Sequence, residues 1–258
     1  MTLKLLSYNI RYGGVGREKL LADVIRESAP DIVVFQEATR PQVVERLATE
    51  TGMGTWAARA GYSLGFMSRL EIAHHEWHRP AGVRHPFLEI VPAGADLRVF
   101  GVHLSAVHSS WTERRRVGEL RGVLGGIKPH RESFHVLAGD FNTLAPGEIL
   151  DVRKLPPRLR PFVWLSGGRI QWETIRVMLD SGYLDGYRIL HPQDKGFTFP
   201  TWDPHLRLDY VFLPVLFAGR LTACQVIQES PQVTQASDHL PLLARLGIED
   251  GQGVSNGN

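Results

Sequence analysis

The stretch FHVLAGDFNT, residues 134–143, ends an apolar run in a carboxylate and a carboxamide. The run is typical of a buried strand, and Gly139 allows the backbone to turn as it leaves the sheet. Asp140 and Asn142 stand two residues apart, so on an extended backbone both side chains point the same way and reach one bound group. Ordinary turn formation by Asp and Asn accounts for the same pattern. Partners elsewhere in the chain decide between these two interpretations.

Strand and helix patterns recur on both sides of this stretch. Strands are expected at 3–8, 31–35, 62–67, 87–91, 97–104, 197–199, 208–213, 221–227 and 240–246, and helices at 18–29, 41–51, 111–127 and 170–180. Helices recur between strands without a regular βαβ array, which favours an α/β layered domain with mixed sheets. We expect one domain over residues 1–248 and a disordered polar tail over 249–258.

Composition excludes several classes of protein. Of the 258 residues, 43% are hydrophobic and 22% are charged, and the net charge of +2 gives no global case for a polyanionic partner. Cys224 is the only cysteine, which excludes an internal disulfide. The first residues lack the apolar core of a signal peptide, and no segment approaches the roughly 18 apolar residues of a membrane span. We therefore expect a cytoplasmic monomer with no transmembrane segment and no obligate protein partner.

Polar side chains stand at the ends of many of the apolar strands, where one rim of a sheet would gather them. They are Asn9, Glu37, His103, Asp140, Asn142, Asp209, Asp238 and His239. Oxygen ligands of this kind suit Mg²⁺ or Mn²⁺, which bind through one or two carboxylates and a substrate phosphate. Zinc would require more imidazole or thiolate.

Six segments in register resemble the signature blocks of the endonuclease/exonuclease/phosphatase superfamily, whose fold is similar to that of deoxyribonuclease I. In order they are SYNIR, FQEA, GVHLS, AGDFNT, RLDYVFL and SDHLPL, and they span residues 7–242. Over its full length the chain is most similar to bacterial metal-dependent hydrolases of that superfamily. The resemblance implies a four-layer αββα sandwich of two mixed sheets flanked by helices, with an active site at one rim.

The resemblance also implies a metal side of that site. Asn9 and Glu37 would lie at a Mg²⁺ or Mn²⁺ ion, with Glu37 as its principal ligand. Asp238 would be a further acid on the side of the metal or of the histidines.

Catalytic roles follow from the same blocks. Asp140 would orient or deprotonate the attacking water, and Asn142 would hold that water and a phosphate oxygen. His103 and His239 would donate hydrogen bonds to the phosphoryl oxygens. Asp209 would pair with His239 and favour its charged form.

The implied activity is phosphodiester hydrolysis by in-line attack of water, and nucleic acid is the first expected substrate. A nucleic-acid substrate predicts that the basic segment from Asp151 flanks the cleft. That segment loses all periodicity up to residue 168 and is interpreted as a lid, or else as a surface loop. The predicted substrate contacts are Arg158, Arg160, Trp164 and Trp202. The alternative is a phospholipid or small-molecule phosphoesterase, similar to sphingomyelinases or inositol phosphatases, in which residues 162–164 form an exposed apolar tip.

Two further clusters, one of arginines and one of histidines, stand outside these blocks. The arginines at 114–116 on the helix at 111–127 are expected at a solvated face or beside the nucleic-acid cleft. The histidines at 74, 75, 78 and 85 surround Trp77 but lack the helical HExxH spacing, so structural or surface roles are expected for them.

Overall fold

A computed structural model of the chain describes residues 1–81, 83–106, 110–149, 151–154 and 172–249. One sheet contains Thr2–Asn9 (β1), Ile32–Gln36 (β2), Thr55–Ala58 (β3), Gly65–Ser68 (β4), Leu221–Val226 (β11) and Leu242–Gly247 (β12). The other contains Ile72–His78 (β5), Phe87–Pro92 (β6), Arg98–His103 (β7), His135–Asp140 (β8), Tyr183–Asp185 (β9) and Asp209–Pro214 (β10). The α-helices are Glu18–Ser28 (α1), Pro41–Thr51 (α2), Ser110–Gly126 (α3), Glu173–Asp180 (α5), Gly186–Leu190 (α6) and Val233–Ala236 (α7).

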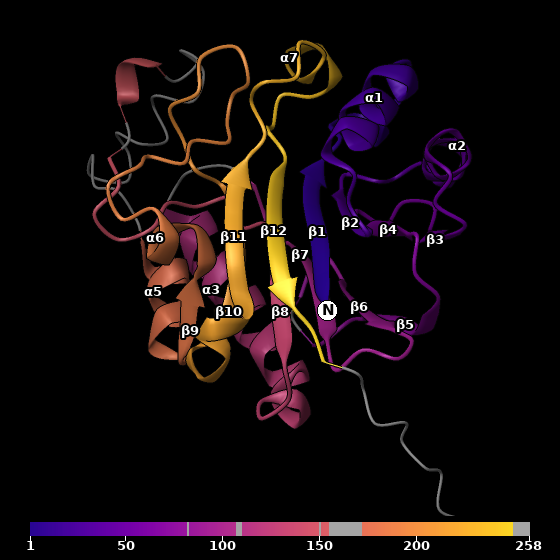
Figure 1. Cartoon of the computed structure of the whole chain (residues 1–258). Helices are drawn as coiled ribbons and strands as arrows, with labels where there is room; N and C mark the ends of the chain where they lie inside the picture. The colour runs from indigo at the N-terminus through magenta and orange to yellow at the C-terminus, as the bar shows by residue number, and fades with distance from the viewer. Residues whose placement is uncertain (82, 107–109, 150, 155–171, 250–258) are drawn as a thin grey trace, which may run out of the picture.

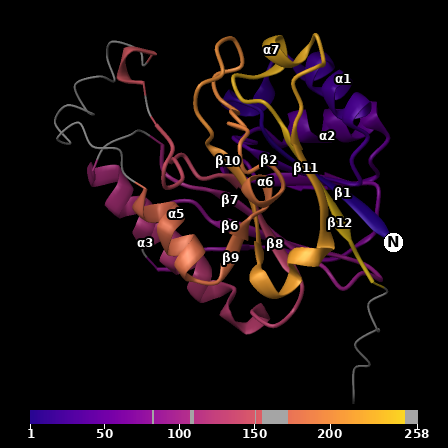
Figure 2. The same ribbon diagram turned by 60° about the vertical axis from the view of Figure 1, so that its left-hand side comes forward.

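The two sheets pack face to face, and helices cover their outer faces (Figures 1 and 2). The first sheet has the order β11-β12-β1-β2-β4-β3 and the second has the order β5-β6-β7-β8-β10-β9. Each sheet contains one parallel pair, β1 with β2 and β7 with β8, and otherwise antiparallel pairs. The predicted αββα sandwich of mixed sheets is confirmed.

Strand β1 shows why the sequence forms layers. Leu3 and Leu5 belong to the core between the sheets, whereas Leu6 and Tyr8 belong to the core beneath α1 and α2. Successive side chains of a strand point to opposite faces, so a strand buried on both faces has an almost continuous apolar sequence. A third core lies between the second sheet and the helices α3 and α5.

The parallel pairs determine where the polar strand ends lie. Asn9 and Gln36 are register partners at the carboxyl ends of β1 and β2. His103 and Asp140 are register partners at the carboxyl ends of β7 and β8. These ends lie at the upper rim in Figure 1. The rim therefore collects the polar residues that interrupt the apolar strands.

Gly139 does not form the predicted turn out of the sheet but allows two strands to approach closely. It lies inside β8, and a Cβ at this position would stand 1.8 Å from the carbonyl oxygen of Val102 on β7. Only glycine permits this approach of the two strands. The close pairing places His103 and Asp140 side by side at the rim.

A few predicted elements differ from the structure. The stretch expected as a strand at 197–199 forms only an isolated bridge between Phe199 and Leu206. Strands β3 and β9 and helices α6 and α7 were not predicted, because elements of three to five residues carry too little periodicity. Residues 250–258 of the predicted tail and residues 155–171 of the predicted lid lie outside the described residues.

A buried ion cluster joins the strands of the second sheet. Glu89 on β6 is 4% exposed, accepts a hydrogen bond from Nε2 of His78 at 2.7 Å, and forms an ion pair with Arg98. Burial opposes ionisation of Glu89, but these two partners outweigh it and hold the pKa of its carboxyl below the ordinary value. His78 therefore has a structural role, because its ring contacts the buried carboxylate of Glu89.

No helix in the described part of the chain is both long enough and apolar enough to cross a bilayer.

Candidate active site

Asp140, the last residue of β8, is the centre of the polar rim. Its side chain is buried, and its neighbours in register are His103 on β7 and Asp209 on β10. Oδ1 accepts a hydrogen bond from the backbone N–H of Asn142 at 2.8 Å, and Oδ2 accepts one from Nδ2 of Asn9 at 3.1 Å. Both interpretations of the pattern at 140–142 therefore contribute, because Asp140 closes a local turn and also contacts residues distant in sequence.

Asn142 does not continue an extended backbone, contrary to the expected geometry. It has a left-handed φ of 53°, and its Nδ2 donates to the backbone oxygen of Leu104 at 3.0 Å. Glu37, just after β2, is also left-handed, with a φ of 59°. Non-glycine residues in this region are strained by about 1–2 kcal/mol each, and such strain is concentrated at functional sites.

Two imidazoles approach the same oxygen of Asp140. Nε2 of His103 and Nε2 of His239 each lie 3.8 Å from Oδ2 of Asp140. Both separations exceed hydrogen-bond length, so each Nε2 can be directed to a bound group. Burial raises the pKa of Asp140, and repulsion by Asp209 adds to the increase while His239 opposes it. A buried carboxylate with a raised pKa is suited to accepting a proton.

His239 is held as an imidazolium. Its Nδ1 donates to Oδ2 of Asp209 at 2.9 Å, and its ring packs against that of Phe199 with centroids 4.8 Å apart. Burial lowers the pKa of His239, but the carboxylates of Asp209 and Asp140 outweigh it, and the net pKa lies above the ordinary value. This ring is therefore charged at neutral pH.

His103 is in the opposite state. Its Nδ1 is hydrogen-bonded to Oγ of Ser63, and its ring stacks on His85 with centroids 5.6 Å apart and planes inclined by 11°. No carboxylate partner of Nδ1 is found among the described residues. Burial, together with repulsion by His85 and His239, lowers the pKa of His103 to about 3. The site thus combines one neutral and one charged imidazole.

Ser63 and His85 were missed as site residues by the sequence patterns. Ser63 precedes β4 and also accepts a hydrogen bond from the backbone N–H of Glu37 at 3.0 Å. His85 belongs to a histidine cluster for which structural or surface roles were expected, and no local pattern indicates that it stacks on His103. These contacts depend on pairing between distant segments.

Asn9 and Glu37 form the side of the site where a metal ion fits. Oε2 of Glu37 accepts from the backbone N–H of Tyr12 at 2.6 Å, and Nδ2 of Asn9 lies 3.5 Å from Oε1. No Lys, Arg or His forms an ion pair with Glu37 within the part of the chain that the structure describes. A carboxylate of this kind, linked through Asn9 to Asp140, is suited to Mg²⁺ or Mn²⁺. Asp238 is instead paired with Nε of Arg11 at 3.2 Å.

A second acidic group is geometrically close but chemically different. Ligand atoms of Asp140, Asp209 and His239 lie within 4.8 Å of one another. A metal ion requires a neutral imidazole, whereas His239 donates its Nδ1 proton to Asp209 and is charged. The chemistry of these donors therefore favours the Asn9–Glu37 side for a divalent cation.

Of the four predicted substrate contacts, Trp202 is the one that lies among the described residues. Trp202 is 66% exposed and packs edge-on against Phe199, which contacts the ring of His239. The other three, Arg158, Arg160 and Trp164, lie outside the described residues.

The hypothesis that the arginines at 114–116 flank the cleft is corrected at one position. Arg116 is 1% exposed, with Nη2 bound to Oε2 of Glu113 at 2.8 Å and Nη1 donating to the backbone oxygen of Ser105 at 2.9 Å. A guanidinium satisfied in this way fixes α3 to the chain after β7. It is not available to a substrate.

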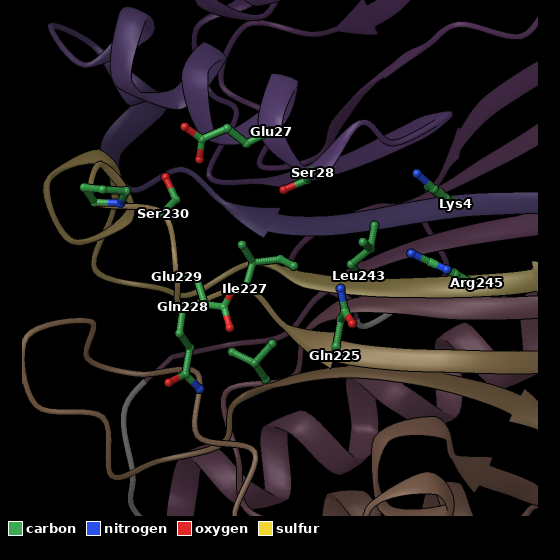
Figure 3. A pocket seen from close by; sticks show the side chains of 12 residues that line it. Lys4, Glu27, Ser28, Gln225, Ile227, Gln228, Glu229, Ser230, Leu243 and Arg245 are labelled. Atoms are coloured by element: carbon green, nitrogen blue, oxygen red, sulfur yellow. The ribbon is translucent and has the colours of Figure 1, made fainter.

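A cavity of about 600 Å³ lies elsewhere, on the outer face of the first sheet beside the end of α1 (Figure 3). Lys4 and Arg245, which are cross-strand partners, line one end of it, and Glu27 lies farther along the wall. None of the rim residues around Asp140 lines this cavity.

Comparison with known proteins gives a family and a fold. A model of the endonuclease/exonuclease/phosphatase family matches residues 6–239. No curated protein matches the sequence. A solved structure of the 3′ phosphatase NExo from Neisseria, bound to a product DNA hairpin, is similar with a TM-score of 0.71 and 22% identity, covering 95% of this chain and 99% of that one. The structure of an AP endonuclease from Archaeoglobus fulgidus is similar with a TM-score of 0.66 and 19% sequence identity. The match covers 94% of this chain and 98% of that chain.

A further similar structure is an endonuclease/exonuclease/phosphatase protein from Beutenbergia cavernae, with a TM-score of 0.70 and 22% identity. It covers 96% of this chain and 72% of that chain. At these identities the structural likenesses establish the fold alone.

Proposed function

Since this chain belongs to the endonuclease/exonuclease/phosphatase family, whose members hydrolyse phosphoester bonds, we propose that it is a divalent-metal-dependent phosphodiesterase that acts on nucleic acid. The observation that carries this proposal is the arrangement around Asp140. A buried carboxylate with a raised pKa lies between a charged and a neutral imidazole, each 3.8 Å from one of its oxygens. Phosphodiester hydrolysis requires a proton acceptor for water and donors for the phosphoryl oxygens.

Asp140 is the proposed proton acceptor. Its hydrogen bonds from Asn9 and from the backbone of Asn142 hold the carboxylate at the rim. The attacking water would bind at this carboxylate, in line with the leaving oxygen, and lose its proton to it. Asn142 would hold the water and one phosphate oxygen.

The two imidazoles would divide the stabilisation of negative charge. His239 enters the reaction as an imidazolium, since Asp209 holds its Nδ1 proton. Its Nε2–H would donate to a phosphoryl oxygen on which charge grows in the transition state. His103 would donate from the Nε2–H of a neutral ring, because the hydroxyl of Ser63 can occupy its Nδ1.

Glu37 and Asn9 would hold Mg²⁺ or Mn²⁺, and Asp238 would support that side of the site through its pair with Arg11. The ion, when bound, would neutralise charge on the phosphoryl group and its leaving oxygen. Nucleic acid is favoured as substrate because Trp202 is exposed beside Phe199 and His239, where a base could stack.

The proposal is tested by a substrate panel with Mg²⁺, with Mn²⁺ and with EDTA. The panel contains single-stranded, nicked and abasic DNA, RNA, sphingomyelin, inositol phosphates and a small generic phosphodiester. We expect metal-dependent cleavage of the small diester and of at least one nucleic acid. A folded protein that cleaves nothing with either metal, or that cleaves equally in EDTA, would contradict the proposal. Cleavage of sphingomyelin or inositol phosphates with nucleic acids untouched would reject the proposed substrate class.

A further inference from the structure

Two loops of the chain meet beside His103, outside the blocks that define the family. The segment that follows β3 ends at Ser63, which is hydrogen-bonded to His103. The segment between β5 and β6 contributes His85, which stacks on the same imidazole. Both loops are therefore anchored at the candidate active site through His103.

These loops carry three exposed arginines, Arg59, Arg79 and Arg84. In the part of the chain that the structure describes, none of the three lies within 4.0 Å of a carboxylate oxygen, the separation that defines an ion pair. Elsewhere in the fold, arginines at positions such as 98, 116, 207 and 220 are paired with acids. Unpaired guanidinium groups next to a phosphoesterase site form an electrostatic surface for phosphate.

Aromatic rings hold two of these cations in place. The guanidinium carbon of Arg59 lies 4.4 Å from the ring centroid of Trp77, and that of Arg79 lies 5.5 Å from the centroid of Tyr62. The two rings meet edge to face, with centroids 6.4 Å apart. Trp77 is itself fixed, because its Nε1 donates to the backbone oxygen of Leu64 at 3.0 Å. The cations are therefore presented on a rigid base, which limits the entropy lost when phosphate binds.

The charge of this surface reaches the histidines. Burial lowers the pKa of His85, and repulsion by Arg84 and Arg79 lowers it further. Glu119 is the opposing acid, but its carboxylate accepts hydrogen bonds from the backbone N–H of Ser105 at 2.9 Å and from its hydroxyl at 2.7 Å. The charges of Arg84 and Arg79 therefore act on the imidazole that stacks on His103.

We propose that Arg59, Arg79 and Arg84 form a subsite for the phosphates of a nucleic-acid strand that leaves the active site on the side of His103. This inference rests on the proposed function, and it deepens that proposal by locating the flanking strand. Trp202 lies on the other side of the site, beside Phe199 and His239. Several cations on adjacent loops suit a repeated phosphate backbone, whereas a single small phosphoester would need only the central site.

The test compares the wild-type chain with Arg59→Gln, with the double variant Arg79→Gln/Arg84→Gln and with the triple variant. Glutamine keeps much of the side-chain stem and removes the charge. Binding of a fluorescein-labelled oligothymidylate is measured by anisotropy in EDTA, so that the strand is not cleaved. The logarithm of the association constant is plotted against the logarithm of salt concentration between about 50 and 200 mM. Hydrolysis of a small phosphodiester with Mg²⁺ is measured in parallel.

Arg245→Gln is the matched control. Arg245 is also exposed, but it pairs in register with Lys4, whereas Asn9 at the rim is five residues farther along β1. At about 3.3 Å per residue this distance is roughly 17 Å. The control makes the same change in net charge as the single variant Arg59→Gln without touching the proposed subsite.

Each arginine removed from the subsite is expected to reduce the magnitude of the slope of this plot by about 0.7. The triple variant is expected to reduce it by about 2. Hydrolysis of the small diester is expected to be unchanged. A thermal melt is expected to show a folded protein, with a small decrease in melting temperature from loss of the contacts of Arg59 with Trp77 and of Arg79 with Tyr62. An unchanged slope in the triple variant would overturn the subsite, as would an equal loss in Arg245→Gln. A folded triple variant that loses hydrolysis of the small diester would also overturn it, because the arginines would then act in the chemistry itself. Absence of any diester hydrolysis by the wild type would instead refute the proposed function, while the slopes would still judge the subsite.

Discussion

Replacing Asp209 by Asn tests the assignment of His239 as a charged donor. Asp209 Oδ2 lies 2.9 Å from Nδ1 of His239, and both side chains are buried. Two unit charges at that separation attract each other by about 6 kcal/mol at an effective dielectric constant of about 20. This energy corresponds to about a 10⁴-fold change in the proton affinity of the imidazole. Asn at position 209 removes this attraction. The remaining burial of His239 then disfavours its charged form.

The expected result is an enzyme that folds but has lost its charged donor at neutral pH. We expect kcat to fall by about 10²–10⁴-fold, the range for removal of a positioned acid or base. Because the folded pKa of His239 is raised in the wild type, its charged form persists above the ordinary value of 6.5 and is lost only as pH rises through the folded value. In Asp209→Asn the pKa of His239 falls. The difference in kcat between this variant and the wild type should therefore become smaller as pH decreases and the His239 ring is protonated again.

The assay is the pH profile of kcat on a small phosphodiester, with circular dichroism and thermal unfolding measured alongside. Asp185→Asn is a matched control, because Asp185 is also a buried carboxylate and lies 2.6 Å from Nη1 of Arg207. Loss of the ion pair with Arg207 destabilises the fold. The kcat of Asp185→Asn relative to the wild type is nevertheless expected not to recover as pH decreases. If Asp209→Asn kept kcat within a few-fold of the wild type, or lost the same factor at every pH, the assignment would be refuted.

Two further predictions concern the framework that holds the site. Glu89→Gln is expected to lower the free energy of unfolding by about 1.5–3 kcal/mol at neutral pH. Because the folded pKa of Glu89 is depressed, this difference should be complete above the unfolded value near 4.5 and vanish as pH falls through the folded value, which urea titrations at several pH values would check. Gly139→Ala should cost more than about 3 kcal/mol, since its Cβ would overlap the Val102 oxygen at 1.8 Å, and an unfolding free energy equal to the wild type would show that β7 and β8 can separate freely.

The layers of the fold were predictable because strand periodicity is local. Leu5 and Leu6 are adjacent in sequence and enter different cores, as expected for a strand buried on both faces. The polar strand ends were likewise visible as interruptions of apolar runs. The register that brings His103 and Asp209 next to Asp140 follows from strand pairing in the fold that the family blocks implied.

The remainder of the site depends on contacts that no local pattern encodes. Ser63 meets His103 across 40 residues of sequence, so Nδ1 of His103 contacts a hydroxyl, whereas Nδ1 of His239 contacts the carboxylate of Asp209. Asn142 departs from the extended geometry because its backbone N–H closes a turn onto Asp140. The histidine-rich strand β5 is exposed along most of its length, so its sequence lacks the apolar alternation of the inner strands. The arginine subsite is similarly assembled from two loops whose proximity only the fold determines.

The central claim is that Asp140 accepts the proton of the attacking water, and the value of kcat/KM for Asp140→Asn tests it most directly. The carboxamide keeps the size of the side chain and one acceptor oxygen for the N–H of Asn142, so the fold should persist, as a thermal melt would verify. With saturating Mg²⁺ and a small phosphodiester, we predict a loss of about 10²–10⁴-fold relative to the wild type. A folded Asp140→Asn protein that hydrolyses the diester at the wild-type rate would contradict the account.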